Sequence, residues 1–216
     1  MAPRTSRDAP VTERPPYHLL APRPPAEGAV DLDALVPGQG PLELDLGFGR
    51  GASLFARAAV APDARILGIE VKPRLVVHTD RRLRAAGLDR VRVLCADARE
   101  LLARAGPARS VRAVAIHFPD PWWKRRQRKR ALVCDALLDA LARLLRPGGM
   151  LFIQTDVLER GQQYEAMIRA HPSFRLAPTP ADNPLGAPSH RELRIVRDGL
   201  PVARILAYRT DDEVPP

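Results

Sequence analysis

The chain has 216 residues and a formal net charge of +9, with 34 Lys and Arg against 25 Asp and Glu. This length suits one domain with a sizeable core, and the positive charge favours a polyanionic partner such as nucleic acid. Two cysteines are too few for a disulfide scaffold, and no apolar run reaches the ~18–20 residues that span a bilayer. We therefore expect a cytoplasmic protein.

The N-terminal stretch differs in composition from the rest of the chain. Residues 1–39 are rich in Pro, Arg and Ala and show no sustained periodicity. This composition predicts a flexible basic arm. The folded domain is expected over residues 40–210, with residues 211–216 as a tail.

Strands and helices alternate through the predicted domain, because short apolar runs are each followed by an amphipathic stretch. The predicted strands are 42–46, 65–70, 91–95, 111–118 and 150–154, and the predicted helices are 52–60, 73–86, 97–105, 132–145 and 157–170. This alternation is typical of an α/β fold with a doubly wound, mostly parallel sheet of the Rossmann-like kind. Near the C-terminus, residues 191–196 and 202–208 predict a hairpin around an Asp-Gly turn, with 202–208 as an antiparallel strand.

A glycine-rich loop follows the first strand, where residues 45–51 read Asp-Leu-Gly-Phe-Gly-Arg-Gly. Counted through Ala52, the loop fits a dinucleotide fingerprint, with Glu70 as the acid that binds the ribose. Counted from Asp45, it fits the nucleoside loop of enzymes that use S-adenosylmethionine (SAM). The glycines alone leave the cofactor open between NAD and SAM.

Acidic residues at four successive strand ends favour SAM. A carboxylate at Asp45 would repel the pyrophosphate of NAD and attract the cationic methionine end of SAM. Glu70 is placed to accept hydrogen bonds from the ribose hydroxyls, and Asp97 to accept one from the adenine amino group. Asp120 is placed beside the cationic part of SAM. Each acid alone is equally consistent with a helix N-cap. Four acids in corresponding positions favour a shared site.

The segment after the fourth strand is the most distinctive. Residues 118–130 read Phe-Pro-Asp-Pro-Trp-Trp-Lys-Arg-Arg-Gln-Arg-Lys-Arg. The prolines break the strand pairing, and six of the last seven residues are cationic. Aromatic side chains beside dense positive charge are typical of nucleic-acid binding, whereas an acid at a strand end suits a small-molecule site. Together they indicate chemistry performed on a nucleic acid.

These segments resemble the bacterial tRNA (guanine-N7)-methyltransferases, which use SAM to modify a guanine in the variable loop of tRNA. The resemblance covers about residues 42–209. Its specific part is 118–125, and the other matching segments are 44–51, 68–70, 96–98 and 154–156. The family therefore implies a SAM-dependent enzyme with tRNA as its partner, no metal, and a monomer or homodimer.

The resemblance also implies roles for individual residues. SAM would be bound by Asp45, Gly47, Gly49, Glu70, Asp97, Ala98 and Asp120, and the tRNA or its guanine by Lys124, Asp156, Ser189 and Glu192. Three positions depart from the family pattern: Asp45 stands for Glu, Gln127 for His, and Ser189 for the Thr of a Thr-x-x-Glu motif. The family further implies a short helix from Ser189, against the hairpin predicted above.

Methylation of guanine N7 needs no general base, since N7 has a lone pair and no proton. Catalysis would depend on positioning and on carboxylates that stabilise the positive charge on the base. We expect Asp120, as the catalytic residue, or Asp156 to accept hydrogen bonds from the guanine N1–H and amino group.

Two other functions remain consistent with the sequence: a SAM-dependent methyltransferase for another RNA position, and a non-catalytic RNA-binding protein on the same fold. An NAD-dependent reductase would leave Asp45 and the basic segment without a role.

Overall fold

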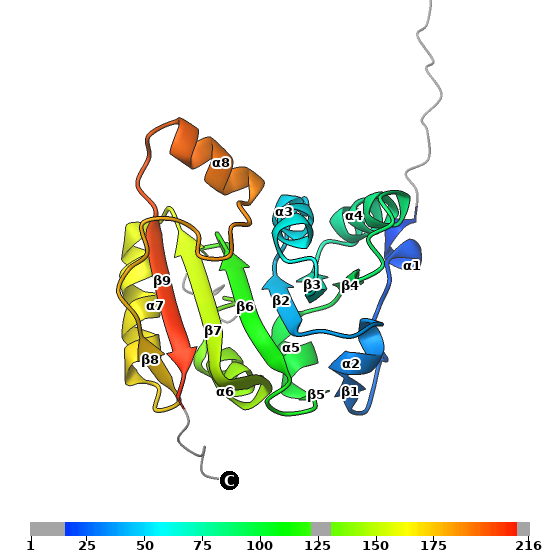
Figure 1. Cartoon of the computed structure of the whole chain (residues 1–216), viewed down its shortest axis with the longest axis horizontal. Helices are drawn as coiled ribbons and strands as arrows, with labels where there is room; N and C mark the ends of the chain where they lie inside the picture. The colour runs from blue at the N-terminus through cyan, green and yellow to red at the C-terminus, as the bar shows by residue number, and fades with distance from the viewer. Residues whose placement is uncertain (1–15, 122–130, 211–216) are drawn as a thin grey trace, which may run out of the picture.

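A computed structural model of the chain describes residues 16–121 and 131–210. Its centre is a seven-stranded sheet with the order β4-β3-β2-β6-β7-β9-β8 (Figure 1). The strands are β2 (Leu42–Leu46), β3 (Arg65–Glu70), β4 (Val91–Cys95), β6 (Val111–His117), β7 (Leu145–Thr155), β8 (Phe174–Leu176) and β9 (Ala203–Arg209). Strands β2, β3, β4, β6 and β7 run parallel, whereas β9 pairs antiparallel with both β7 and β8. The predicted doubly wound, mostly parallel sheet is confirmed.

Helices cover both faces of the sheet and bury separate apolar clusters. On one face, α5 (Ala98–Ala103), α6 (Asp135–Leu144) and α7 (Leu158–Ala170) contribute to one large buried cluster with the leucines of β2. On the other face, α3 (Ala52–Val60) and α4 (Pro73–Ala85) pack on β3 and β4. Over β6 and β7 that second face is covered by a loop, because Leu185 and Ala187 pack against Phe152 and its neighbours. The second face therefore changes from helices to a loop near the middle of the sheet.

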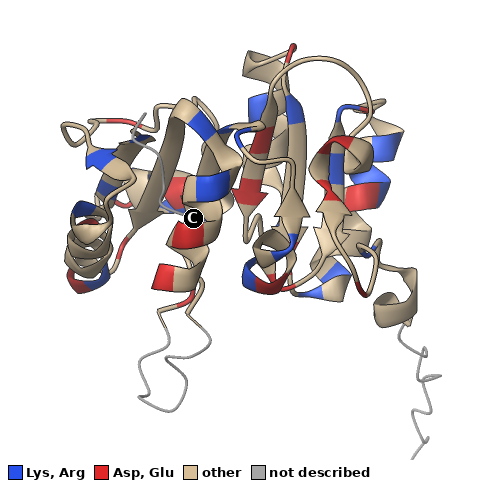
Figure 2. Cartoon of the chain, turned by 90° about the horizontal axis from the view of Figure 1, so that it is seen from below, with Lys and Arg blue, Asp and Glu red and all other residues tan. Residues whose placement is uncertain are grey.

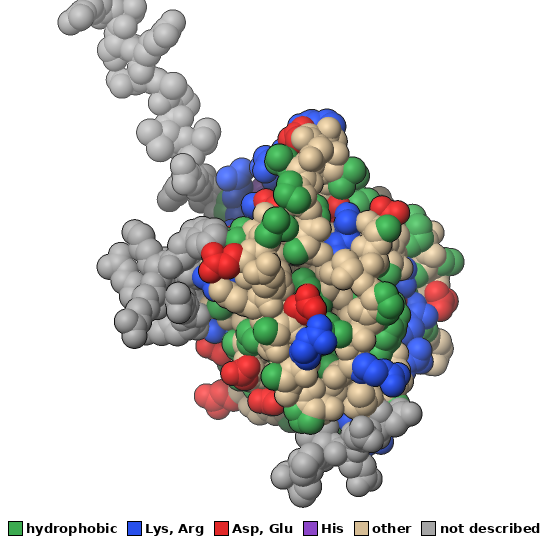
Figure 3. Space-filling model, turned by 90° about the vertical axis from the view of Figure 1, so that its left-hand side faces the viewer, with side chains coloured by type: hydrophobic (Ala, Val, Ile, Leu, Met, Phe, Trp, Pro, Cys, Tyr) green, Lys and Arg blue, Asp and Glu red, His purple; other side chains and the backbone are tan. Residues whose placement is uncertain are grey.

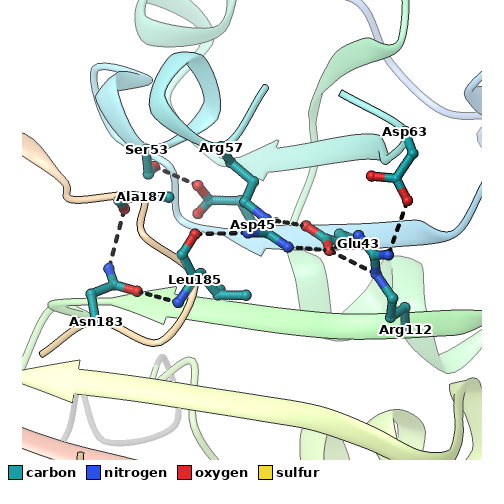
Figure 4. Close-up of polar contacts among 9 residues, drawn as sticks. All are labelled: Glu43, Asp45, Ser53, Arg57, Asp63, Arg112, Asn183, Leu185 and Ala187. Carbon is teal, nitrogen blue, oxygen red and sulfur yellow. Dashed lines mark hydrogen bonds and ion pairs between the residues drawn. The ribbon is translucent and has the colours of Figure 1, made fainter. Parts of the chain in front are cut away.

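Strand β2 lies inside the sheet and is buried along its whole length, although it contains two acids. The carboxylate of Glu43 is paired with two arginines, Arg57 from α3 and Arg112 from β6, each at 2.7 Å (Figure 4). Asp45, two residues further along, accepts a hydrogen bond from the Ser53 hydroxyl at 2.5 Å. Buried carboxylates need such partners, since burying an unpaired charge is costly.

Part of the predicted arm contributes to the fold. Within residues 16–39 the chain forms α1 (Tyr17–Leu20), β1 (Val30–Asp31) and α2 (Leu32–Leu35), and β1 pairs with β5 (Ala105–Gly106). Val30 and Leu32 belong to the main core cluster. These elements are too short to show periodicity in the sequence, so tertiary contacts decide their structure. Residues 1–15 and 211–216 lie outside the described residues.

The C-terminal hairpin prediction is half wrong. Strand β9 forms as expected, but the segment predicted to pair with it is instead the helix α8 (His190–Arg197). Ser189 accepts a hydrogen bond from the Glu192 backbone N–H, and the Glu192 side chain accepts one from the Ser189 N–H. This reciprocal capping box begins a helix and not a strand.

Candidate active site

A cavity of about 600 Å3 opens where the parallel strands end. Its lining comes from segments far apart in the sequence: residues 46–52, 69–75, 96–99, 117–120 and 189–194, together with Leu132. In open α/β sheets, ligands bind outside the carboxyl ends of the strands. The cavity is therefore at the position where the sequence analysis placed the site.

The glycine-rich loop forms one wall of the cavity through its backbone. Gly47, Gly49 and Gly51 all have positive φ, at 76°, 58° and 78°, a region that favours glycine over other residues. A Cβ on Gly47 would meet only the cavity-lining side chain of Leu132, at 3.9 Å. At Gly51 a Cβ would lie 2.7 Å from Thr79 of α4. The first two glycines shape the wall, and the third permits close helix packing.

Glu70 ends β3 and is held in place at the cavity wall. One of its carboxylate oxygens accepts the backbone N–H of Gly49 at 3.2 Å, and the other accepts that of Lys72 at 3.0 Å. The residue is only 7% exposed. Each oxygen keeps a further lone pair, so the carboxylate can also accept from a pair of hydroxyl groups, as predicted for a ribose.

Asp97 and Ala98 follow β4 on the same side of the cavity. The Arg99 guanidinium donates to the Asp97 carboxylate at 2.6 Å, and this bond lowers the pKa of Asp97 below its usual value. Asp97 also accepts the backbone N–H of Arg99 and caps helix α5. The carboxylate thus has a structural role as well as a place in the lining.

Asp120 lies at the cavity mouth, on the segment that follows β6. Its side chain is 64% exposed, and one oxygen is 3.9 Å from the Lys72 ammonium. The chain turns sharply before it, since Phe118 has a φ of 50° and its N–H donates to the Gln154 carbonyl at 2.7 Å. A positive φ is rare for a bulky residue and is often found at functional sites.

Asp45 does not line this cavity. It is 4% exposed, and burial raises its pKa above the usual value for an aspartate. Its carboxylate faces a second, internal cavity of about 20 Å3 beneath the glycine loop. The geometry therefore places Asp45 under the wall, in contact with the start of α3.

The N-cap and the first two turns of α8 form the opposite wall. Ser189, Arg191 and Arg194 line the cavity there. Arg191 donates to Asp156 at 2.7 Å and lies over the ring of Phe118, with 5.7 Å between guanidinium carbon and ring centroid. The structure thus pairs the predicted substrate residue Asp156 with a cation of α8.

Glu192 points inward and is 3% exposed. Besides its part in the capping box, it accepts a hydrogen bond from Gln154 at 2.6 Å and one from Asn183 at 3.1 Å. Lys124, the remaining predicted substrate residue, lies outside the described residues.

Sequence reasoning missed three residues of the site. Arg191 and Arg194 were assigned to a strand, and the Ser189-x-x-Glu192 capping signal is the feature that would have placed them on a helix. His117, to which the sequence analysis gave no role, lines both the large and the small cavity. Its position directly before the Phe-Pro-Asp-Pro segment is the only sequence signal for it.

Charge is mixed over much of the surface. Figure 2 shows Lys and Arg positions interspersed with Asp and Glu along the helices and strands, and Figure 3 shows basic, acidic and apolar side chains side by side on one face. The cavity lining is mixed as well, since Glu70, Asp97 and Asp120 border it together with Arg50, Lys72, Arg99, Arg191 and Arg194. Among the residues that the structure describes, no cluster suited to a metal ion occurs and no helix is long and apolar enough to cross a membrane.

Comparison with known proteins assigns the family. A family model described as "Putative methyltransferase" matches residues 39–204. A tRNA (guanine-N(7)-)-methyltransferase from Parasynechococcus marenigrum is 37% identical over 183 residues, which make up 81% of this chain and 78% of that protein. The chain belongs to the tRNA (guanine-N7)-methyltransferase family. A relative of the same name from Nitrosococcus oceani is 40% identical over 147 residues, covering 68% of this chain and 62% of that protein.

Solved structures agree on the fold. The 16S rRNA methyltransferase KamB superposes with a TM-score of 0.57 at 16% identity, over 82% of this chain and 91% of that chain. At this identity the likeness shows the fold alone. It matches the Rossmann-like architecture expected for the family.

Proposed function

We propose that this chain transfers the methyl group of SAM to N7 of a guanine in the variable loop of tRNA. The observation that carries the proposal is the cavity at the strand ends, which the glycine loop and Glu70 border on one side and Asp120 and α8 on the other. Family membership supports the same reaction. Since tRNA is cytoplasmic in bacteria, we place the enzyme there.

The wall that contains the glycine loop, Glu70 and the Asp97–Ala98 segment, called the cofactor wall below, fits SAM. The backbone at Gly47 and Gly49 leaves room beside it, Glu70 offers two oxygens for ribose hydroxyls, and the Asp97–Ala98 segment borders the position expected for adenine. SAM supplies an electrophilic methyl group on a sulfonium. Glu70 and Asp97 on this wall suit the hydroxyl and amino donors of the ribose and the adenine.

Asp120 is the better placed of the two acids for orienting the guanine. Its carboxylate is exposed at the cavity mouth, where Lys72 approaches no closer than 3.9 Å. Asp156 is instead engaged by Arg191 at 2.7 Å and lies outside the cavity lining. We assign to Asp120 the hydrogen bonds to the guanine N1–H and amino group, which turn N7 toward the methyl group. A carboxylate there also stabilises the positive charge that develops on the ring.

The wall formed by α8 is called the substrate wall below. Its Arg191 and Arg194 supply the positive charge that a tRNA backbone requires. Both border the cavity from α8, and neutralising phosphates with arginines is the main source of affinity in nucleic-acid binding. The basic residues 124–130 follow the Asp120 segment in the sequence. We propose that they extend this interaction.

The test is to incubate the protein with labelled SAM and unmodified tRNA, and to map the label by mass spectrometry. Label in 7-methylguanosine of the variable loop is the expected result. Label in another nucleoside would keep the enzyme class and refute the position. An absence of label despite tRNA binding would refute the catalytic function.

A further inference from the structure

A chain of buried polar side chains connects the sheet to the first turn of α8. It consists of His117 at the end of β6, Gln154 in β7 and Glu192 in α8, which are 7%, 0% and 3% exposed. The Gln154 amide nitrogen lies 2.7 Å from His117 Nδ1 and 2.6 Å from Glu192 Oε2. Burying such polar groups costs free energy unless they are hydrogen-bonded. Their pairing therefore indicates which atoms donate and which accept.

The donors and acceptors in this chain allow one arrangement. A glutamine amide nitrogen only donates, and its two hydrogens are directed at the Glu192 carboxylate and at His117 Nδ1. His117 Nδ1 must therefore accept, which makes the imidazole neutral with its proton on Nε2. Glu192 of α8 thus determines, through Gln154 of β7, the tautomer of a histidine at the end of β6.

At one end, the chain terminates in the capping box of α8. Glu192 Oε2 also accepts from the Ser189 N–H at 3.4 Å and from Asn183 at 3.1 Å. Asn183 in turn donates to the Ala187 carbonyl, and Arg57 donates to the Leu185 carbonyl at 2.7 Å (Figure 4). The loop before α8 and the first turn of α8 are therefore held by polar contacts to the sheet and α3.

At the other end, the chain faces the cofactor wall. Among the described residues, His117 Nε2, Gln154 Oε1 and Asp45 Oδ1 are buried without a hydrogen-bond partner. His117 and Asp45 border the internal cavity of about 20 Å3, which has room for one water molecule. Asp45 is bonded to Ser53 at the start of α3 and shares this small cavity with His117.

We propose that His117 and Gln154 are positioning residues for the substrate wall: the neutral Nε2–H tautomer of His117 orients Gln154, and Gln154 fixes Glu192 and with it the first turn of α8. The substrate that this turn meets is the tRNA of the proposed function, on which the inference rests. Arg191 lies in that turn and Arg194 in the next one, and both line the cavity, so loosening the first turn displaces the cations that meet the tRNA. Gln154 and Glu192 lie outside the lining of the large cavity, so we expect the cofactor wall not to depend on them.

The kinetic test compares four variants. Gln154→Glu sets a carboxylate against Glu192 and removes the hydrogen bond to that charged group. His117→Phe removes the group that accepts the second hydrogen bond of Gln154. Each is expected to raise the KM for tRNA about tenfold, the size expected for one buried hydrogen bond. For Gln154→Glu, whose position lies outside the lining of the large cavity, the dissociation constant for SAM should change less than twofold. Matched controls are Gln163→Glu and His171→Asn on or next to α7, both away from the cavity and expected to leave both constants unchanged.

A conservative replacement separates positioning from mere core filling. In His117→Asn, the side-chain oxygen can take the place of Nδ1 and accept from Gln154. We expect a KM for tRNA within about threefold of the wild type. An Asn variant as impaired as the Phe variant, or equal effects on SAM and tRNA, would overturn the positioning role.

A spectroscopic test needs neither tRNA nor SAM. Nitrogen-15 NMR of the wild-type imidazole should show His117 neutral with the proton on Nε2, and the Gln154→Glu change should abolish that signature. A proton on Nδ1 in the wild type would refute the link. A wild type that shows the expected tautomer but never methylates tRNA would instead refute the proposed function.

Discussion

The two walls of the cavity are built in different ways. The cofactor wall presents backbone groups of the glycine loop and the carboxylates of Glu70 and Asp97, each fixed by N–H groups beside it. The substrate wall presents arginines on α8. The first turn of this helix is fixed by hydrogen bonds of Glu192 to Gln154 and to the Ser189 N–H. Under the proposed function, the carboxylates meet the ribose and adenine of SAM, and the arginines meet the polyanionic tRNA. We conclude that binding of each ligand can be altered separately.

The largest effect is expected where the walls meet. Asp120→Ala should lower kcat about 10²–10³-fold, because it removes the group that orients the base and stabilises its charge in the transition state. The dissociation constants for SAM and tRNA should each change less than threefold. Single-turnover kinetics with labelled SAM measure the step directly. Asp182→Asn, at an exposed position of the loop before α8, serves as the control. Near-normal turnover of Asp120→Ala would show that Asp120 has no part in the mechanism.

A change on the cofactor wall should affect SAM alone. In Glu70→Gln an amide nitrogen confronts the backbone N–H of Gly49 or Lys72, and the ribose loses a charged acceptor. The affinity for SAM should fall about 10–100-fold, as expected for hydrogen bonds to a charged group. Isothermal titration calorimetry measures this, with the exposed Glu159→Gln of α7 as the matched control. If tRNA affinity fell by a similar factor, the two walls would not be independent.

A change on the substrate wall should affect tRNA alone. Arg194→Ala is expected to raise the KM for tRNA about three- to tenfold and to reduce the salt dependence of binding by about one charge. Arg197→Ala is the control on the same helix, since Arg197 is paired with Asp198 and lies outside the cavity lining. Equal effects of the two substitutions would mean that the cations of α8 act only through the net charge.

The smallest effect concerns stability. Asp97→Asn keeps a residue that can cap α5 and removes the charge paired with Arg99, so the free energy of unfolding at pH 7 should fall by about 0.5–1 kcal/mol. Because the folded state lowers the pKa of Asp97, its contribution is present above the ordinary Asp pKa and is lost as the pH falls through the folded value. Urea unfolding across the acid range should show the two proteins converging. A constant difference would contradict the role of the charge, and Asp89→Asn provides an exposed control.

The cofactor wall could be predicted from the sequence because its parts are local. The glycine loop, Glu70 and Asp97 each follow a strand directly, and parallel strands bring their carboxyl ends together. The pattern did not reveal that the Asp45 carboxylate lies below this wall. Whether an acid at a strand end faces the ligand or the helix behind it depends on side-chain contacts, here with Ser53.

The substrate wall was harder to predict because distant segments meet there. A β-branched, charged stretch such as residues 191–196 fits a strand as well as a helix by composition. The capping contacts of Ser189 and Glu192 decide for the helix, and Glu192 is held in turn by Gln154 from another strand. Such long-range pairing has no periodic signal, which explains why His117 and the arginines of α8 were missed.

The most direct measurement uses a tRNA that contains 7-deazaguanosine at the methylated position, where a C–H group replaces N7. The altered base keeps the N1–H and amino group that Asp120 is proposed to bind. We predict unchanged binding of this tRNA and of SAM, with no transfer of label to the altered nucleoside or to any other. Continued labelling of this tRNA would show that the accepting atom is elsewhere and would contradict the account.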